Sequence, residues 1–296
     1  MDGCLQSLIE KSSELPDEIV IVDGEGGKIQ DIVLKWQEKF GSIMLIPTKN
    51  INLAVSRNKG LSACSGGIIA LTDDDVMVDA DWIKRIKYLH EAHPESGVIG
   101  GKIKSAGGKF IDRISEAVIF PFGEKAGYVR TVAGANASYK REVINRVGEY
   151  DESLFRGEDV DYNWRAIKLG YRIYYDPGLI VYHSHRHAWK DLFYQIFMYG
   201  QAYYLVRKKW KDMYCVYPHK IKNLKDALKF AYFFIGILYE PLLMSIKMKR
   251  FADKVLSYPI IVANNLCWKF GMIKQMLVHG RKAASVLDME ENAGNG

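Results

Sequence analysis

The chain has 296 residues and a formal net charge of +6, with 48% hydrophobic and 26% charged residues. This composition is typical of a folded protein and excludes a wholly disordered chain, and the length allows a substantial core. Basic residues crowd the second half, in runs 206–211, 219–225 and 247–250. They indicate an anionic partner, either nucleic acid or a phospholipid surface.

The cysteines and the N-terminal residues indicate a cytosolic protein. The four cysteines are Cys4, Cys64, Cys215 and Cys267. They form no CxxC pair, so neither a zinc site nor a disulfide framework is predicted. No basic patch, apolar core and cleavage site open the chain, so no signal peptide is predicted. In a reducing cytosol the sequon at 136–138 would not be glycosylated.

The first part of the chain alternates short β-rich runs with amphipathic helical stretches. The predicted pairs are strand 18–22 with helix 29–40, strand 42–46 with a polar helix, and strand 67–72 with helix 80–93. Such alternation is typical of βαβ units. The predicted fold class is therefore α/β, with a mostly parallel sheet flanked by helices.

From about Lys102 the pattern loosens into Gly-rich loops. Two helices, 140–148 and 158–170, and two short strands, 171–175 and 179–183, are expected in this part of the chain. A glycine-rich turn follows the first strand, but it lacks GxGxxG or GKS spacing and is not a phosphate loop.

Three apolar helical stretches follow His187, at 188–210, 228–246 and 256–277. The second is near the lower limit of the roughly 17 to 25 apolar residues that span a bilayer, and Lys229 and Glu240-Pro241 interrupt it. Its basic flanks favour helices lying in the membrane interface, with lysines toward lipid phosphates. A buried hydrophobic helix or an oligomer contact is the alternative.

Three consecutive acids, Asp73, Asp74 and Asp75, close an apolar run. Adjacent carboxylates repel one another and lose hydration as the chain packs, so something positive belongs beside them. In an extended strand Asp73 and Asp75 would project to one side, where two carboxylates suit Mg²⁺ or Mn²⁺. An Asp-rich cap for the helix starting near Asp79 would account for only one of the acids.

Further candidates lie later in the chain, each with an ordinary structural alternative. Glu158 and Asp159 fall in the first turn of a helix, where acids favour the helix dipole, and the neighbouring Asp161 can pair with Arg165 at i+4.

The histidines and a small-residue loop are equally open to two interpretations. His183 and His185 share one side of a strand, so either could complete an oxygen-rich metal shell, or simply form hydrogen bonds. The loop at 134–136 could be a plain turn with Asn136 in a left-handed conformation.

Two blocks of sequence resemble family 2 glycosyltransferases of the GT-A fold. Residues 56–86 carry an RNxG helix, a small-residue turn, a strand and the DxD acids. Residues 134–183 carry a GAN loop, GxxDE, an ED helix and a terminal His. The resemblance covers roughly residues 4 to 205 and implies an inverting enzyme of the hexosyltransferase type, without a covalent intermediate.

The resemblance also implies roles for particular residues. Asp159 would be the catalytic base, with Glu158 beside it contacting acceptor or sugar hydroxyls, and Asp75 and His183 would bind Mn²⁺ or Mg²⁺. The implied donor-binding residues are Asp23, Arg57, Asp73, Asp74, Gly134 and Asn136. Sugar transfer needs the charge of the leaving diphosphate neutralised and a base for the acceptor hydroxyl, which these residue types can supply.

The chain departs from the family pattern in two places. It opens within the first helix of that pattern, so the first strand is expected to be missing and the natural protein to carry further residues upstream. A missing interior strand would leave unpaired backbone groups costing about 1 to 3 kcal/mol each. Gly24 stands where the family often has a second acid after Asp23, so recognition of the donor base is less securely implied than the metal site.

The leading hypothesis is a membrane-associated glycosyltransferase on the cytoplasmic face, acting on a nucleotide-diphosphate sugar and a lipid-linked or polysaccharide acceptor. The expected organisation is a GT-A domain over 1–205, a basic, apolar, membrane-associating helical region over 206–289 and a disordered tail over 290–296. A non-catalytic donor-binding or membrane scaffold and a sugar-phosphate nucleotidyltransferase are the alternatives. Nucleic acid is not an expected partner, because the lysines are interleaved with long apolar runs.

Overall fold

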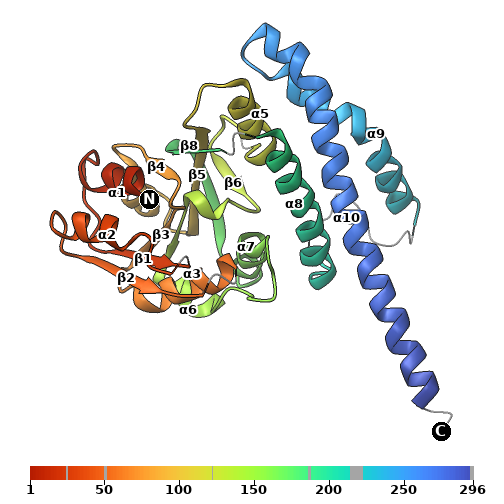
Figure 1. Ribbon diagram of the computed structural model, residues 1–296, viewed down its shortest axis with the longest axis horizontal. Coiled ribbons are helices and arrows are strands. Elements are labelled where there is room, and N and C mark those ends of the chain that lie inside the picture. Colours follow the sequence, from red (N-terminus) through yellow and green to blue (C-terminus); the bar gives the residue numbers. More distant parts are fainter. Residues whose placement is uncertain (25, 50–51, 122, 186–187, 214–222, 294–296) are drawn as a thin grey trace. The chain divides into compact units, whose positions relative to one another are not determined.

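The computed structural model describes residues 1–24, 26–49, 52–121, 123–185, 188–213 and 223–293, with side chains as far as His279. Cys215, residues 219–222 of one predicted basic run and residues 294–296 of the predicted tail lie outside this description. The chain divides into two compact units, Met1–His185 and Arg186–Gly296, here called the sheet unit and the helical unit (Figure 1).

The sheet unit begins with a small βαβ layer. Its elements are α1 (Asp2–Ile9), β1 (Ile19–Asp23), α2 (Gln30–Gln37) and β2 (Ile43–Pro47). β1 and β2 pair in parallel, from Ile19 opposite Ile43 to Asp23 opposite Pro47. Apolar side chains from all four elements form one cluster around the buried Trp36. The predicted strands and helix of this segment are confirmed.

A second, larger sheet follows in the chain. Its strands are β3 (Ile68–Leu71), β4 (Val76–Val78), β5 (Ser96–Ser105), β6 (Gly127–Val129), β7 (Ala137–Lys140) and β8 (Arg172–His183). The strand order is β3-β7-β5-β8-β4, and β6 also pairs with β8. The intervening helices are α3 (Leu53–Ala63), α4 (Trp82–Ala92), α5 (Phe110–Ile119), the 3₁₀ turn η1 (Gly134–Asn136), α6 (Arg141–Val147) and α7 (Glu158–Lys168).

The predicted α/β class is confirmed, and the larger sheet is mixed. β5 and β8 pair in parallel, whereas the other ladders are antiparallel. Each antiparallel ladder involves β4, β6 or β7, short strands that the hydrophobic pattern did not predict. The two strands expected at 171–175 and 179–183 are one strand, β8, whose register against β5 shifts after Asp176.

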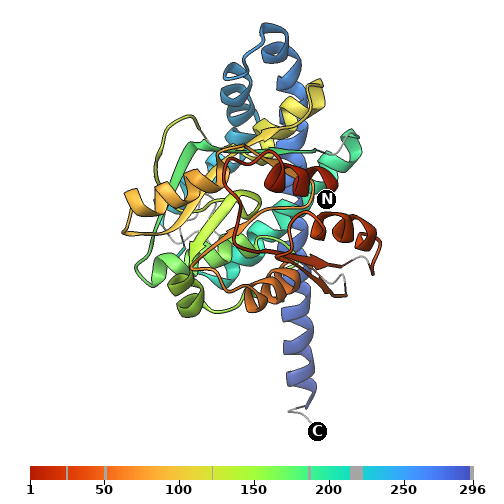
Figure 2. The ribbon, with the colours of Figure 1, turned by 90° about the vertical axis from the view of Figure 1, so that its left-hand side faces the viewer.

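Helices cover both faces of the larger sheet, as Figure 2 shows. Successive side chains of a strand point to opposite faces, so Val98 of β5 joins the cluster formed with α3, α6 and α7. Its neighbour Ile99 joins the cluster formed with α1 and α4. The hydrophobic core of the sheet unit therefore lies in two layers, one on each face.

In the described part of the chain, β1 pairs only with β2, and β3 pairs only with β7 in its sheet. The carboxylate of Glu18, just before β1, accepts hydrogen bonds from the backbone N–H groups of Ser65 (2.5 Å) and Gly66 (2.9 Å), just before β3. The beginnings of the two strands are thus tied together although no ladder joins the strands.

The helical unit contains α8 (Trp189–Lys209), α9 (Leu224–Ile246) and α10 (Phe251–Ala293). Each of the three predicted apolar helical stretches is confirmed as helix. α10 continues beyond the predicted helix into the region expected to be a tail. α8, expected in the first domain, belongs to this unit.

Candidate donor and metal site

The three acids lie in a turn between β3 and β4, not in an extension of the strand. Asp74 and Asp75 occupy the turn itself, so strand alternation does not orient them. β4 pairs with β8 and places Val76 opposite His183, while the backbone N–H of Ser184 donates to the carbonyl oxygen of Asp75 (3.0 Å). The β4–β8 ladder thus brings His183 beside the acids.

Asp73, Asp75 and His183 form a candidate metal-binding group. Each offers one ligand atom, and these atoms lie within 4.8 Å of one another. His183 Nε2 lies 3.4 Å from Asp75 Oδ1. Two carboxylates and an imidazole fit Mn²⁺ well, since Mn²⁺ accepts nitrogen more readily than Mg²⁺ does.

Without a cation, the ionised Asp73 carboxylate of this group is disfavoured. Burial raises the pKa of Asp73, and the Asp75 carboxylate raises it further, against the opposing effect of Arg57. A bound dication would reverse this effect by favouring the ionised carboxylates. Asp74 is not part of the group, and its side chain is 67% exposed.

Arg57 of α3 connects the metal-binding group to α7. Its Nη1 lies 2.5 Å from Glu158 Oε1 and its Nη2 lies 3.9 Å from Asp73 Oδ1. The guanidinium also lies over the ring of Tyr150, 5.6 Å from its centroid. Glu158 is only 4% exposed. Burial raises the pKa of Glu158 to about 7, with a further contribution from Asp159 and an opposing one from Arg57.

The η1 turn contacts α7 through Asp159 and α3 through Arg57. The backbone N–H of Gly134 donates to Asp159 Oδ2 (3.2 Å). A Cβ atom on Gly134 would lie 2.3 Å from Arg57 Nη2, so only glycine leaves room for the guanidinium. The predicted pair of Asp161 with Arg165 is confirmed at 2.9 Å, so this neighbouring acid has a structural role.

Asn136 has a buried side chain whose hydrogen bonds are made within the protein. Its Nδ2 donates to the carbonyl oxygens of Lys102 (3.1 Å) and Leu179 (2.9 Å), and its Oδ1 accepts from Trp82 Nε1 (2.9 Å). Both of its N–H donors are used, so the amide fixes the η1 turn against β5, β8 and the start of α4. The sequon at this position is correspondingly inaccessible.

Asp23 lies at the carboxyl end of β1. Its Oδ2 accepts a hydrogen bond from the Gly27 backbone N–H (2.7 Å), which closes the turn after β1. Both Gly26 and Gly27 have positive φ angles, 77° and 93°. Val22, the preceding residue, lies against Gly60 of α3, the helix that also carries Arg57. A role for Asp23 in binding the donor base stays a prediction.

Two aromatic neighbours of the site were not predicted. Phe120, after α5, lies with its ring centroid 5.7 Å from that of His183, and Tyr150 lies beneath Arg57. His185 stacks on His183, with 4.9 Å between ring centroids, and is not part of the metal-binding group. Burial lowers the pKa of His185 to about 4, with a smaller contribution from His183. Of the two candidate histidines, the structure thus brings His183 to the acids.

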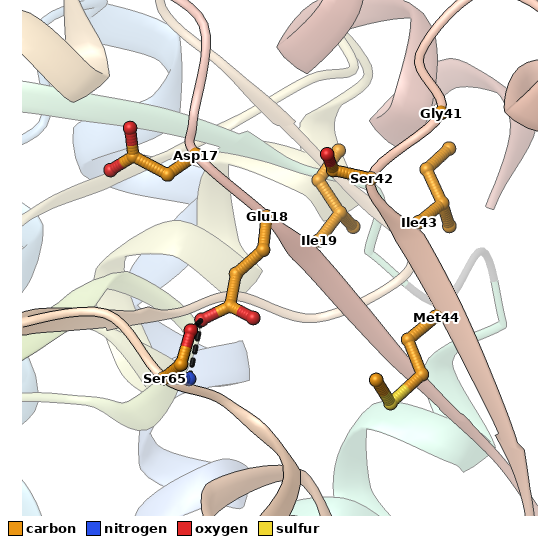
Figure 3. Close-up of a pocket in the computed structure, with 8 residues that line it drawn as sticks. All are labelled: Asp17, Glu18, Ile19, Gly41, Ser42, Ile43, Met44 and Ser65. Atoms are coloured by element: carbon orange, nitrogen blue, oxygen red, sulfur yellow. Dashed lines mark hydrogen bonds between the residues drawn. The ribbon is translucent and has the colours of Figure 1, made fainter.

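A separate cavity of about 370 Å³ lies near the beginnings of β1 and β2 (Figure 3). Its lining includes Glu18 and Ser65, which are joined by a hydrogen bond, and the half-exposed Met44. Asp23 lies at the opposite end of β1, so this cavity is distinct from the candidate site.

Comparison with known proteins identifies the family. A model of glycosyl transferase family 2 matches residues 1–148, and the chain belongs to this family. A glucosyl-dolichyl phosphate glucuronosyltransferase of Haloferax volcanii is 27% identical over 191 residues, 59% of this chain and 58% of that protein. An O-antigen chain rhamnosyltransferase of Salmonella typhimurium is 26% identical over 202 residues, 64% of each chain. A pre-mycofactocin glycosyltransferase of Mycobacterium tuberculosis is 30% identical over 151 residues, 47% of this chain and 31% of that protein.

Solved structures show the GT-A fold. The mannosyltransferase PcManGT from Pyrobaculum calidifontis, in complex with GDP-Man and Mn²⁺, superposes with a TM-score of 0.58 at 18% identity, over 91% of this chain and 81% of that one. GalNAc-T7 with UDP, GalNAc and Mn²⁺ superposes with a TM-score of 0.53 at 17% identity, over 80% of this chain and 53% of that one. The predicted family and fold are therefore confirmed.

Proposed function

We propose that the chain is a metal-dependent, inverting glycosyltransferase. It would move a sugar from a nucleotide-diphosphate sugar to a hydroxyl group of a lipid-linked or polysaccharide acceptor. The observation that carries the proposal is the convergence of Asp73, Asp75 and His183 beside Arg57, in a chain of this family. The names of two relatives, which refer to a dolichyl phosphate and to the O-antigen chain, support this acceptor class.

Asp75 and His183, with Asp73, would hold Mn²⁺ or Mg²⁺. When bound, the ion supplies positive charge that stabilises the leaving diphosphate. Arg57 adds a second positive charge near the same position, while its contact with Glu158 fixes its orientation.

Asp159 is assigned as the base. As the acceptor hydroxyl oxygen forms its bond to the anomeric carbon, the hydroxyl proton passes to an Asp159 carboxylate oxygen, and the bond from that carbon to the diphosphate oxygen breaks with its electron pair. Attack from the side opposite the leaving group inverts the anomeric centre in one displacement. The Gly134 N–H group holds the Asp159 carboxylate in place.

The proposed location is the cytoplasmic face of a membrane, and the helical unit supports the membrane part of this proposal. Among the described helices, α9 is long and apolar enough to cross a bilayer, and 17% of its most apolar window is buried. The proposed partners are thus a donor, an acceptor and an anionic lipid surface.

The test is incubation of the purified chain with Mn²⁺, membranes and a panel of nucleotide sugars, with release of nucleoside diphosphate as the readout. Asp159→Asn should lower transfer by about 10² to 10⁴-fold while metal-dependent binding of UDP or GDP, measured by calorimetry, persists. Asp75→Ala should lose both. Asp31→Asn, which changes an exposed carboxylate on α2, is the control and should retain both.

Equal transfer by Asp159→Asn and the unmodified chain would reject the assignment of the base. Metal-dependent nucleotide binding without release from any donor would instead support a donor-binding scaffold.

A further inference from the structure

A set of polar side chains lies between α9 and α10 in the helical unit. Asn265 Nδ2 donates to Glu240 Oε2 (2.7 Å) and to the Gly236 carbonyl oxygen (3.3 Å). Lys269 Nζ lies 3.8 Å from the same Glu240 oxygen, and Lys269 is only 3% exposed. Glu240, Asn265 and Lys269 are here called the polar seam. They join the two helices as an antiparallel hairpin.

The outside of α9 is apolar. Its exposed large apolar residues include Leu228, Phe234, Ile235, Leu238, Leu242 and Ile246, here called the outer face. α10 likewise exposes Phe251, Val255 and Leu256. A helix pair in water normally buries apolar residues and exposes charged ones. In this hairpin α9 exposes large apolar side chains, while Glu240 and the buried Lys269 lie between the two helices, as expected in lipid.

The length and the ends of α9 match a bilayer. Its 23 residues extend about 35 Å at 1.5 Å per residue, compared with about 30 Å for a hydrocarbon core. Exposed basic residues flank the outer face, with Lys225 at the start of the helix and Lys247, Lys249 and Arg250 in the bend before α10. Such residues complement anionic lipid phosphates.

We propose that α9 and α10 insert into a phospholipid membrane as one hairpin. The outer face lies among the acyl chains, and the basic residues of the bend lie at the phosphates. The polar seam holds the helices together where water is absent, because Glu240 and Lys269 satisfy one another and Asn265 bonds to both Glu240 and the backbone. This inference specifies the membrane partner proposed above, but it is independent of the assigned chemistry.

Flotation of the full chain with vesicles tests insertion without any nucleotide sugar. The chain should float with vesicles of equimolar phosphatidylcholine and phosphatidylglycerol. Replacing two outer-face residues, Ile235→Glu with Leu238→Glu (63% and 58% exposed), should weaken binding at least about tenfold. The control, Leu34→Glu with Tyr88→Glu (51% and 62% exposed), places two acids at equally exposed positions of the sheet unit and should float like the unmodified chain.

Unchanged flotation of the outer-face variant, with helix content preserved by circular dichroism, would overturn the proposal. So would failure of the unmodified chain to float. If size-exclusion chromatography shows a dimer that the outer-face variant abolishes, and no flotation occurs, a second copy covers the outer face and the lipid assignment is wrong.

The polar seam has its own test. Lys269→Met should lower the melting temperature of the vesicle-bound chain because it removes the positive charge beside the Glu240 carboxylate, and adding Glu240→Gln should restore most of the loss. Equal melting temperatures for all three proteins would show that the seam does not hold the hairpin.

Discussion

Arg57 contacts both sides of the candidate site, the metal-binding group and the acids of α7. Burial disfavours its charge, but Tyr150, Glu158, Asp159 and Asp73 together more than offset this effect, so its pKa lies above the ordinary arginine value. It reaches Asp73 and Glu158 with different nitrogens of one planar group. A lysine ammonium could not make both contacts from a single point charge. The positions of the metal-binding group and of the α7 acids are therefore coupled through one side chain.

Glu158 should make stability depend on pH. In the folded chain its pKa is about 7, above the ordinary glutamate value of 4.5 expected after unfolding. Between these values the folded state binds the proton more tightly, so ionisation of Glu158 costs stability as pH rises from about 5 to 8. Glu158→Gln removes this cost. The variant should therefore gain roughly 1 to 3 kcal/mol relative to the unmodified chain between pH 5 and pH 8.

Urea unfolding of both proteins at the two pH values measures this difference. Glu142→Gln, at an exposed position of α6, is the control. Its free energy of unfolding should differ from that of the unmodified chain by the same amount at both pH values. If Glu158→Gln changes the free energy of unfolding equally at pH 5 and pH 8, the pKa of Glu158 is not raised in the folded chain.

At the scale of single residues, the sequence predicted which side chains form the candidate metal site, but not the backbone geometry that brings them together. Asp73, Asp75 and His183 were predicted from carboxylate chemistry and family resemblance, and the structure brings them together. The expected strand geometry was not the cause, because the acids lie in a turn. Phe120 and Tyr150 were not predicted, since no local pattern marks an aromatic side chain that packs against a residue far along the chain.

Strand β5 shows why part of the sheet could not be predicted from local patterns. Its glycines resemble a loop sequence, since glycine is depleted in strands. In the structure each marks a close approach: Cβ atoms at Gly97, Gly100 and Gly101 would lie 2.6, 2.2 and 2.1 Å from Val143, Val132 and Leu179. These contacts come from distant parts of the chain, so only the tertiary structure explains the glycines.

Glycine also controls the packing of α8 against α10. A Cβ atom on Gly271 would lie 1.9 Å from the Phe197 carbonyl oxygen, and one on Gly200 would lie 1.9 Å from that of Trp268. Helix propensity alone predicts that Gly271→Ala stabilises the helix by about 1 kcal/mol. The close backbone contact predicts the opposite, a loss of about 1 to 3 kcal/mol.

Thermal unfolding of Gly271→Ala, followed by circular dichroism, shows whether the substitution raises or lowers the stability of the chain. Met276→Ala, at a more exposed position of α10, is the control for changes in helix propensity. A higher melting temperature for Gly271→Ala than for the unmodified chain would show that α8 and α10 do not meet at this residue.

The whole molecule combines two units with different chemistry. The sheet unit carries the metal-binding group, and the helical unit carries the outer apolar face and the polar seam. The sequence predicted the α/β class and the apolar helices, because both have strong local periodicity. It placed α8 with the first domain because composition does not reveal that α8 packs against α10, a contact between distant segments.

A ligand of the donor site should stabilise mainly the unit that binds it. Mn²⁺ with UDP or GDP, at one hundred times the dissociation constant, should add about 2.7 kcal/mol to the stability of the sheet unit. Differential scanning calorimetry should show a higher melting temperature for this unit, reversed by a chelator.

Asp75→Ala should abolish the calorimetric shift, because it removes a carboxylate of the metal-binding group. Asp31→Asn again serves as the control. A nucleotide-induced shift of the same size in Asp75→Ala would place the ion away from these residues.

The separate ladders of β1 and β3 affect how the protein must be handled. Within the described residues, each strand has an edge that its sheet leaves without a ladder partner. Open edges are templates onto which a strand of a neighbouring molecule can add. Concentrated solutions, and refolding mixtures in particular, should therefore lose material to β-rich aggregates, and dilution should improve the recovery of soluble protein.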